Sequence, residues 1–273
     1  MILTDVHTHS DFSADGVSPL AEMLARAEAF GVKYYGVSEH FDYDYLADGV
    51  LCEGKAVPMT DAEAYFACAR ALQAERGHGT RLLVGGEFGY TPNTRAHAMY
   101  ADVIRRYSPD FVVNSVHTVD GTDVWFGEYF AGKAKEPAYR GYLERVKESL
   151  DAPYRYDIVG HIGYVARNAP YDDRAMRYAD YADLLDGILR GIVARDKILE
   201  VNSSGRGAGD FIPGTDVLAR YFALGGRLVS FASDAHSADR ICDKRGEVAA
   251  ALRAVGFTHI AVPDRGKRHF VEI

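Results

Sequence analysis

The chain has 273 residues, of which 48% are hydrophobic, and its formal net charge is −8. This length and apolar content suffice for one large core, so we expect a single domain over residues 1–273. The acidic balance argues against long nucleic acid and anionic membranes as partners, and no apolar run approaches the ~18 residues that a membrane-spanning helix needs.

The three cysteines, Cys52, Cys68 and Cys242, are odd in number and lack a CxxC spacing. They predict no disulfide framework and favour a reducing compartment. No charged and apolar leader precedes the first predicted strand, so we expect a soluble protein of the cytoplasm. The sequence predicts no particular oligomeric state.

Apolar runs typical of buried strands alternate with helical patterns along the whole chain. The predicted strands span residues 2–6, 33–38, 81–89, 110–117, 156–161, 197–202 and 227–234. The predicted helices span residues 18–30, 60–76, 94–106, 137–150, 172–195, 213–224 and 246–255. Residues 43–59 show no clear period and predict a loop, whereas residues 259–262 and 268–271 predict a final strand or hairpin.

Two of the helix starts carry capping signals. Ser18 precedes Pro19, which predicts a serine N-cap with proline at the first helical position. Thr60, with Glu63 three residues later, resembles a capping box. We therefore expect Ser18 and Thr60 to cap the helices that follow them.

The repeated alternation of strand and helix is the pattern of parallel βα units. Right-handed crossovers would close such units into a barrel or wind them into an open sheet, and the residues leave both arrangements open. In either architecture, sites form at the carboxyl ends of the strands. The polar chemistry of this chain also follows its strands, so we expect the functional site at that end.

The first strand ends in the sequence Asp5-Val-His7-Thr-His9. Side chains alternate along a strand, so His7 and His9 are expected to point the same way. Two neutral imidazoles on one face can form half of a metal site. An isolated HxH is weak evidence, and the remaining strand ends decide its meaning.

Six of the seven predicted strands end in His, Asp or Glu. The candidate ligands are His7, His9, Asp15, His40, Glu87, His117, His161, Asp234 and His236. So many imidazoles and carboxylates in one low-dielectric site would be costly unless metal cations compensated them. Nine ligands exceed what one ion takes, so we expect two or three divalent ions, and N/O ligation without thiolate favours Zn, Mn or Fe.

The ordered motifs DxHxHSxFSxDG, SEHFD, GGEFGY, NSVHTVDG, GHIGYVAR, LEVNSSG and SFASDAHSADRIC resemble those of the polymerase and histidinol phosphatase (PHP) family. More narrowly, they are similar to its monofunctional histidinol-phosphate phosphatases, and the likeness runs through the whole chain. The resemblance implies a distorted (β/α)7 barrel with a trinuclear metal site.

The resemblance also implies a ligand set for each ion. The first ion would take His7, His9, Glu87 and Asp234; the second Glu87, His117 and His161; the third Asp15, His40 and His236. Some members of the family have a histidine where this chain has Asp15. A carboxylate is a competent hard ligand at that position.

The expected reaction is hydrolysis of L-histidinol phosphate by a hydroxide that bridges two ions. Arg167 matches a basic position of the family, and Arg206 is the second candidate for binding the phosphoryl oxygens. Asp234 or His236 would protonate the leaving alcohol, and the sequence leaves open which.

An amino-alcohol substrate also needs a carboxylate for its ammonium and flat surfaces for its imidazole. Asp42 is the main candidate for the carboxylate. Other residues in suitable loops are Glu39, Phe12, Phe41, Tyr43 and Trp125.

Three other functions stay open at the level of sequence. The first is a PHP phosphoesterase for another small phosphate ester or a nucleotide. The second is an amidohydrolase-type metal hydrolase, although no predicted strand ends in the lysine that often bridges metals in such sites. The third is a metal-holding protein without turnover.

Overall fold

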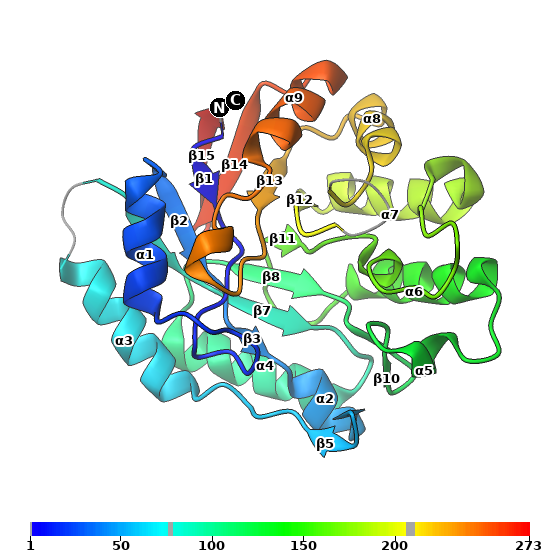
Figure 1. The fold of residues 1–273 in the computed structure, drawn as a ribbon, viewed down its shortest axis with the longest axis horizontal. Coiled ribbons are helices and arrows are strands. Elements are labelled where there is room, and N and C mark those ends of the chain that lie inside the picture. Colours follow the sequence, from blue (N-terminus) through cyan, green and yellow to red (C-terminus); the bar gives the residue numbers. More distant parts are fainter. Residues whose placement is uncertain (1, 76–78, 206–210) are drawn as a thin grey trace.

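The structure is a computed structural model that describes residues 2–75, 79–205 and 211–273 (Figure 1). Its centre is a ring of short parallel strands, which form two hydrogen-bonded sheets in the orders β1-β2-β6 and β13-β12-β11-β8-β7-β3. These strands are β1 (Thr4–Asp5), β2 (Tyr34–Val37), β3 (His40–Phe41), β6 (Arg81–Val84), β7 (Gly86–Gly89), β8 (Val112–Ser115), β11 (Ile158–Val159), β12 (Ile198–Asn202) and β13 (Val229–Ala232).

All seven predicted strands form, and the third is divided into β6 and β7. β3 was not predicted: it lies just beyond the second predicted strand, which ended at residue 38. β2 and β3 pair with β6 and β7, respectively. The ring closes where the amide of Val6 donates to the carbonyl of Phe231 at 3.2 Å. The structure therefore confirms the expected distorted (β/α)7 barrel, whereas the single-domain boundary of residues 1–273 stays a prediction.

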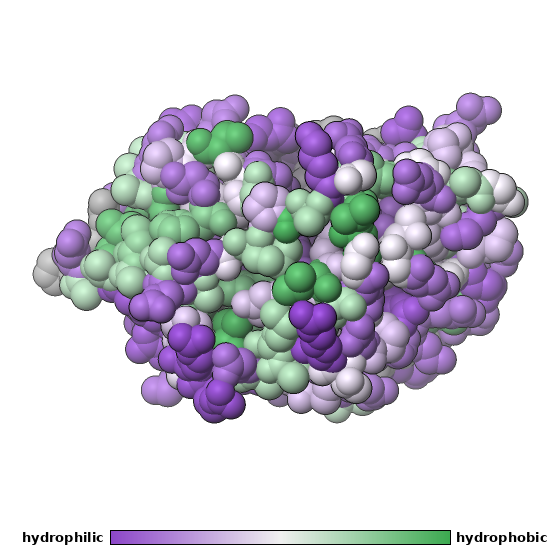
Figure 2. All heavy atoms as spheres, turned by 90° about the horizontal axis from the view of Figure 1, so that it is seen from below, coloured by the Kyte–Doolittle hydropathy of each residue, from purple (hydrophilic) through white to green (hydrophobic). Residues whose placement is uncertain are grey.

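Seven α-helices among the described residues follow the strands and surround the barrel (Figure 1). They are α1 (Leu20–Ala29), α3 (Ala62–Glu75), α4 (Thr94–Tyr107), α6 (Lys135–Ser149), α7 (Ala182–Ala194), α8 (Thr215–Ala223) and α9 (Arg245–Val255). Each buries an apolar stripe, and the polar stripe faces outward. The face seen from below in Figure 2 is accordingly a mosaic of hydrophilic and apolar residues.

Shorter elements occupy the connections on which the sequence showed no period. Residues 43–59 contain α2 (Tyr43–Asp48) and the hairpin of β4 (Leu51–Cys52) with β5 (Lys55–Ala56), so the predicted loop is wrong in part. A second hairpin pairs β9 (Thr118–Val119) with β10 (Thr122–Asp123), and α5 (Gly127–Phe130) follows it. The predicted helix over 172–195 is also too long: residues 178–180 form the 3-10 turn η2, and α7 begins only at Ala182.

Both predicted helix caps are wrong, for the same reason. Ser18 does not cap α1, because its Oγ accepts a hydrogen bond from the amide of Ala238 at 3.1 Å. Thr60 donates its hydroxyl to the carbonyls of Phe12 and His40 instead, and Asp61 accepts from the amide of Ala64 at the start of α3. Tertiary partners outcompete the local capping bonds.

The glycine before β7 has a packing role. The ring of Phe111 is fully buried, and a Cβ on Gly85 would lie 2.5 Å from it. Only a residue without a side chain fits so close to the ring.

A C-terminal hairpin packs across the amino-terminal ends of the strands. It consists of β14 (His259–Asp264) and β15 (Lys267–Glu272), paired antiparallel. At its tip, Arg265 donates its amide to the carbonyl of Asp110 at 2.7 Å and its Nε to the carboxylate of Asp110 at 2.6 Å. The hairpin thus ties the tail of the chain to the barrel end opposite the predicted site.

Candidate metal centre

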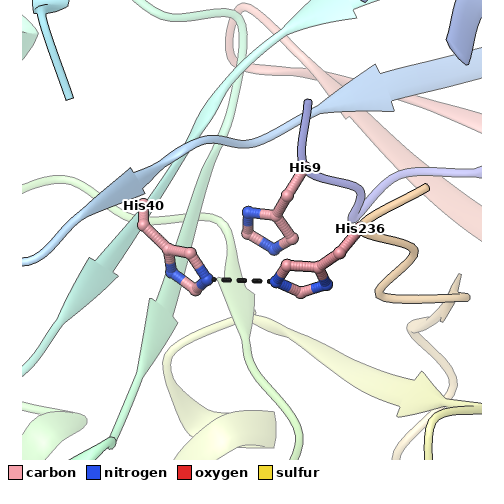
Figure 3. Close-up of side chains that lie close together, drawn as sticks. All are labelled: His9, His40 and His236. Atoms are coloured by element: carbon pink, nitrogen blue, oxygen red, sulfur yellow. Dashed lines mark hydrogen bonds between the residues drawn. The ribbon is translucent and has the colours of Figure 1, made fainter. Parts of the chain in front are cut away.

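Imidazoles from distant parts of the chain converge at the carboxyl ends of the strands. His9 follows β1, His40 begins β3, and His236 follows β13 (Figure 3). The ring of His9 stacks against both of the others, with centroid distances of 4.0 Å to His40 and 4.4 Å to His236. Nε2 of His40 lies 3.4 Å from Nε2 of His236, so nitrogen lone pairs crowd into one small space.

Glu87 on β7 lies at the centre of this cluster, and only 1% of its side chain is exposed. Its Oε1 lies 3.2 Å from Nε2 of His117 and 2.8 Å from Nε2 of His161, and it accepts from the hydroxyl of Ser115 at 2.5 Å. The position of Oε1 between two imidazoles on neighbouring strands agrees with the expected second ligand set.

The other oxygen, Oε2, faces the first and third expected sets. It lies 2.9 Å from Nδ1 of His40, 3.3 Å from Nε2 of His7 and 3.6 Å from Nε2 of His9. Burial alone would raise the pKa of Glu87, but the surrounding imidazoles, His7 foremost, lower the pKa well below its usual value. Glu87 is therefore held as a carboxylate that can bridge cations.

Asp234 follows β13 and faces the same two histidines of the first strand end, His7 and His9. Its Oδ1 lies 3.3 Å from Nε2 of His9 and 3.8 Å from Nε2 of His7. Its backbone has a φ of +55°, in the left-handed region that residues other than glycine seldom adopt. Such strain is typical of functional sites, where the surrounding structure fixes the residue in place.

Three of the imidazoles are oriented by acceptors behind them. Nδ1 of His7 donates to Glu200 at 2.7 Å, and Nδ1 of His236 donates to the main-chain carbonyl of Asp234 at 2.9 Å. Nδ1 of His9 lies 3.4 Å from the hydroxyl of Ser13. Each contact places the proton on Nδ1 and leaves Nε2 as a bare lone pair directed into the cluster, which is how proteins prepare metal-ligating histidines.

Buried polar atoms without hydrogen-bond partners are rare in native proteins. Five of those in the described part of the chain belong to this one cluster: His7 Nε2, His9 Nε2, His40 Nδ1, Glu87 Oε2 and His161 Nδ1. Four of the five are imidazole nitrogens and one is a carboxylate oxygen, and these are the donors that divalent transition metals take. The side chains present therefore fit metal ions.

All nine predicted ligands come together, although not equally deeply. Asp15 is the outlier: 63% of its side chain is exposed, and its Oδ2 lies 3.2 Å from Nε2 of His236. Closely spaced donor groups form around His9–His40–His236, His7–Glu87–His161 and His7–His9–Asp234. A fourth combines His40 and His117 with Asp42, a residue that the sequence had assigned to the substrate.

Arg167, the first predicted phosphate ligand, ends the 3-10 turn η1 (Tyr164–Ala166) and is 6% exposed. Its Nη2 donates to Asp234 at 2.8 Å and to Asn202 at 2.9 Å, while its Nε is buried without a partner. A free N–H beside the cluster is suited to an anionic oxygen. Arg206, the second predicted phosphate ligand, lies outside the described residues.

One wall beside His117 is acidic and aromatic. Asp42 and Asp123 are 9% and 5% exposed, and burial raises the pKa of both carboxyls. Tyr164 stacks on Trp125 with centroids 5.9 Å apart and lies 5.0 Å from the ring of His161. Of the aromatic residues considered from sequence, Trp125 is thus the one placed against this wall.

The other candidates for substrate contact pack into the core or against it, and Phe12 and Tyr43 are only partly buried. Glu39 is fully buried and accepts hydrogen bonds from Ser10 and Ser13, and burial raises the pKa of its carboxyl to about 7. Phe41 is buried to 1% exposure in the core. Phe12 lies against Tyr65, with centroids 5.7 Å apart.

Sequence reasoning missed Glu200, Asn202 and Tyr164. The first two lie on β12 inside an apolar run, where a single acidic residue carries no periodic signal, and their place in the quoted motif LEVNSSG was their one visible signal. Tyr164 lies three residues after His161, within the quoted motif GHIGYVAR, and that proximity was its one visible signal.

The comparisons with known proteins agree with this geometry. Residues 5–204 match the model of the PHP domain. The chain belongs to the PHP family. Over 263 residues it is 30% identical to the histidinol-phosphatase of Lactococcus lactis subsp. lactis (strain IL1403), a match that covers 94% of this chain and 93% of that protein.

Two solved structures of PHP-type fold are similar to this chain. One is histidinol phosphate phosphatase from Lactococcus lactis subsp. lactis, complexed with zinc, L-histidinol and phosphate, with a TM-score of 0.84 and 27% identity over 97% of this chain and 98% of that one. The other, from Listeria monocytogenes, has a TM-score of 0.76 at 20% identity over 89% of this chain and 99% of that one, and supports the fold.

Spanning a bilayer requires a long apolar helix. Among the described residues, every helix is too short or too polar to cross a bilayer.

Proposed function

We propose that this PHP protein is a metal-dependent phosphomonoesterase that hydrolyses L-histidinol phosphate to L-histidinol and phosphate, a step of histidine biosynthesis. The observation that carries the proposal is the 30% identity to the Lactococcus lactis histidinol-phosphatase over 94% of this chain. The convergence of six histidines on Glu87 and Asp234 supports it, because that donor set suits divalent ions and phosphoryl chemistry.

The cofactor is two or three divalent ions from among zinc, manganese and iron. The ligands that would hold them are His7, His9, Asp15, His40, Glu87, His117, His161, Asp234 and His236. When bound, such ions lower the pKa of water toward neutrality and offset the charge of the phosphoryl oxygens. Asp42 lies close enough to His40 to serve as a further oxygen donor, at 3.8 Å from its Nδ1.

Arg167 binds a phosphoryl oxygen through its unpartnered Nε–H. Its Nη2 is anchored on Asp234 and Asn202, so the guanidinium is already oriented before the substrate arrives. A preorganised donor favours the charge that develops during phosphoryl transfer, because no reorganisation is needed at that moment.

Of the two candidates for protonating the leaving alcohol, His236 is favoured over Asp234. Oδ2 of Asp234 accepts from Arg167, from Asn202 at 3.2 Å and from the hydroxyl of Ser204 at 3.1 Å. Those bonds stabilise the ionised carboxylate and, with the charge of Arg167, lower the pKa of Asp234, so Asp234 is better suited to hold a cation than to exchange a proton. His236 is 30% exposed and accessible to the leaving alcohol, so it would position the water molecule through which the alkoxide receives its proton.

The acidic and aromatic wall receives the amino-alcohol part of the substrate. Asp42 and Asp123 would face its ammonium, and the stacked pair Trp125 and Tyr164 would flank its imidazole. This wall lies beside His117 and His161, so the two ends of the substrate are bound at adjacent places.

The proposal is tested by phosphate release from L-histidinol phosphate on protein whose metals have been counted. A phosphate ester that lacks the imidazole and amine is the matched control substrate. We expect strong preference for L-histidinol phosphate with two or three ions bound. Efficient release from the control ester, with L-histidinol phosphate a poor substrate, would keep the chemistry and overturn the substrate.

A further inference from the structure

Two polar residues of β12 lie behind the metal centre and are absent from its expected ligand sets. Glu200 and Asn202 are two residues apart on one strand, so their side chains emerge on the same face. Both are 0% exposed, as are the strand's apolar residues Ile198, Leu199 and Val201. A buried carboxylate is costly unless its oxygens are satisfied, so their contacts should reveal their purpose.

Glu200 binds two of the expected ligands at once. Its Oε2 accepts from Nδ1 of His7 at 2.7 Å, and its Oε1 accepts from the main-chain amide of His161 at 3.0 Å. A carboxylate therefore lies directly behind the imidazole whose Nε2 faces Glu87.

Asn202 continues the same hydrogen-bond network. Its Nδ2 donates to Oε1 of Glu200 at 2.8 Å and to Oδ2 of Asp234 at 3.2 Å. Its Oδ1 accepts from Nη2 of Arg167 at 2.9 Å and from the hydroxyl of Ser204 at 2.5 Å. Every polar atom of the amide faces a partner of the opposite kind, so its orientation is fixed.

Resting on the proposed function, we propose that Glu200 and Asn202 are positioning residues that connect metal retention to phosphate binding. Glu200 holds the His7 ring in the tautomer whose Nε2 can ligate a metal, and its charge makes that nitrogen a better donor. Asn202 binds both Glu200 and Arg167, and so fixes the orientation of the guanidinium that would bind the phosphoryl group. Strand β12 thus positions one metal ligand and one phosphate ligand.

Other expected ligands show that a charged acceptor is not required merely to hold a ring. His9 is held by the hydroxyl of Ser13, and His236 by a main-chain carbonyl. The carboxylate behind His7 therefore adds basicity as well as orientation. Loss of such an outer carboxylate typically weakens metal affinity by about 10–100-fold.

Glu200→Gln tests the metal side of the proposal. Glutamine offers one acceptor oxygen where the carboxylate offers two, so it cannot accept from His7, His161 and Asn202 together. The measurement is zinc affinity of the purified protein by competition with a chelator, which needs no substrate. We expect zinc affinity to fall by about 10–100-fold, and an affinity equal to wild type would overturn the role of Glu200.

Asp110→Asn is the matched control. Asp110 is also a fully buried carboxylate with several hydrogen bonds, but it lies at the opposite end of the barrel. We expect this variant to be less stable and to keep the zinc affinity of wild type. Equal losses of zinc affinity in both variants would mean that Glu200 acts only through general stability.

Asn202→Ala tests the phosphate side independently, and it guards against misfolding of the first variant. The measurement is titration of inorganic phosphate into the zinc-loaded protein. We expect phosphate affinity to fall about 10-fold with the zinc content unchanged, because the charged guanidinium of Arg167 loses its hydrogen bond to the amide oxygen of Asn202. Unchanged phosphate affinity would overturn the role of Asn202 in phosphate binding. If the wild-type protein fails to hydrolyse L-histidinol phosphate, the proposed function fails, but the zinc and phosphate affinities of the variants still decide this inference.

Discussion

Two buried carboxylates at opposite ends of the barrel have opposite surroundings. Asp110 precedes β8 at the amino-terminal end, where Arg70, Arg265, Gln73 and the amide of Val84 all donate to it, at 2.6–2.9 Å. Glu87, at the carboxyl end, faces histidine nitrogens, and its Oε2 has no hydrogen-bond partner. Both are at most 1% exposed.

The difference separates stability from function. Both carboxylate oxygens of Asp110 have hydrogen-bond donors within the protein, so these bonds serve to hold the barrel end and the β14–β15 hairpin together. Glu87 has an oxygen without a donor, and such an unfavourable group persists where a bound ligand supplies the missing partner. Four experiments can break or sharpen this comparison, and they follow in decreasing order of expected effect.

Glu87→Ala should have the largest effect. Glu87 contacts members of all three expected ligand sets, so its loss should remove more than one equivalent of bound metal and lower turnover by at least about 10³-fold. Metal analysis and phosphate release measure the two. Full metal content in this variant would sink the bridging assignment.

Asp110→Ala should instead destabilise the fold by about 3 kcal/mol, because the amide of Val84 and the partly exposed guanidiniums of Arg70 and Arg265 lose their acceptor. Urea unfolding of the metal-free protein measures the loss, and metal bound per folded molecule should not change. Asp102→Ala is the control, since Asp102 is exposed on α4 and pairs with Arg106 at 3.8 Å. It should cost less than about 1 kcal/mol, and equal costs would contradict the special status of Asp110.

Arg167→Met should weaken inhibition by inorganic phosphate by about 10–100-fold, the loss of a charge-assisted hydrogen bond of roughly 1.5–3 kcal/mol. Metal content should be that of wild type, because Arg167 only donates to Asp234 and does not itself offer a lone pair. Inhibition is measured against phosphate concentration at fixed substrate. An unaltered inhibition constant would show that Arg167 serves the fold alone.

The smallest expected effect concerns acid stability. Burial would raise the pKa of Asp110. Hydrogen bonds from the amide of Val84 and from Arg265, Gln73 and Arg70 nevertheless lower this pKa below its usual value. A carboxyl with a lowered folded pKa stabilises the protein fully above its unfolded pKa, and that stabilisation disappears as pH falls through the folded value. Urea unfolding of wild type and Asp110→Asn should therefore converge as pH drops below about 4. If the difference in unfolding free energy between the two proteins did not change with pH, the loss would come from packing and not from the charge of Asp110.

The alternation of strands and helices and the gathering of the candidate ligands were readable from sequence, because both follow local rules, whereas the barrel itself was implied only by the family resemblance. Most candidate ligands follow a short apolar strand, so their place at one end of the sheet follows from the alternation of βα units. Glu200 was not readable, because it lies within an apolar strand and its partner His7 is 193 residues away. The contact that explains this carboxylate exists only after the barrel closes.

The errors in the sequence analysis have the same origin. Residues 43–59 fold into α2 and a hairpin without a repeating apolar pattern, since tertiary contacts such as the bond from Tyr45 to Asp123 hold them. Ser18 has a favourable capping sequence, yet its hydroxyl accepts from Ala238, 220 residues later. Local sequence patterns predict hydrogen bonds between neighbouring residues, and they fail where a residue distant in sequence takes the same donor or acceptor.

The closure of the barrel between β1 and β13 sets the order in which the centre is assembled during synthesis. His7 leaves the ribosome early, whereas Asp234 and His236 follow more than 220 residues later. At roughly 5–20 residues per second, about 10–50 s pass between them. A nascent chain therefore exposes half of a metal-binding cluster long before the other half exists, and the complete centre can be loaded only after translation has delivered the last strand.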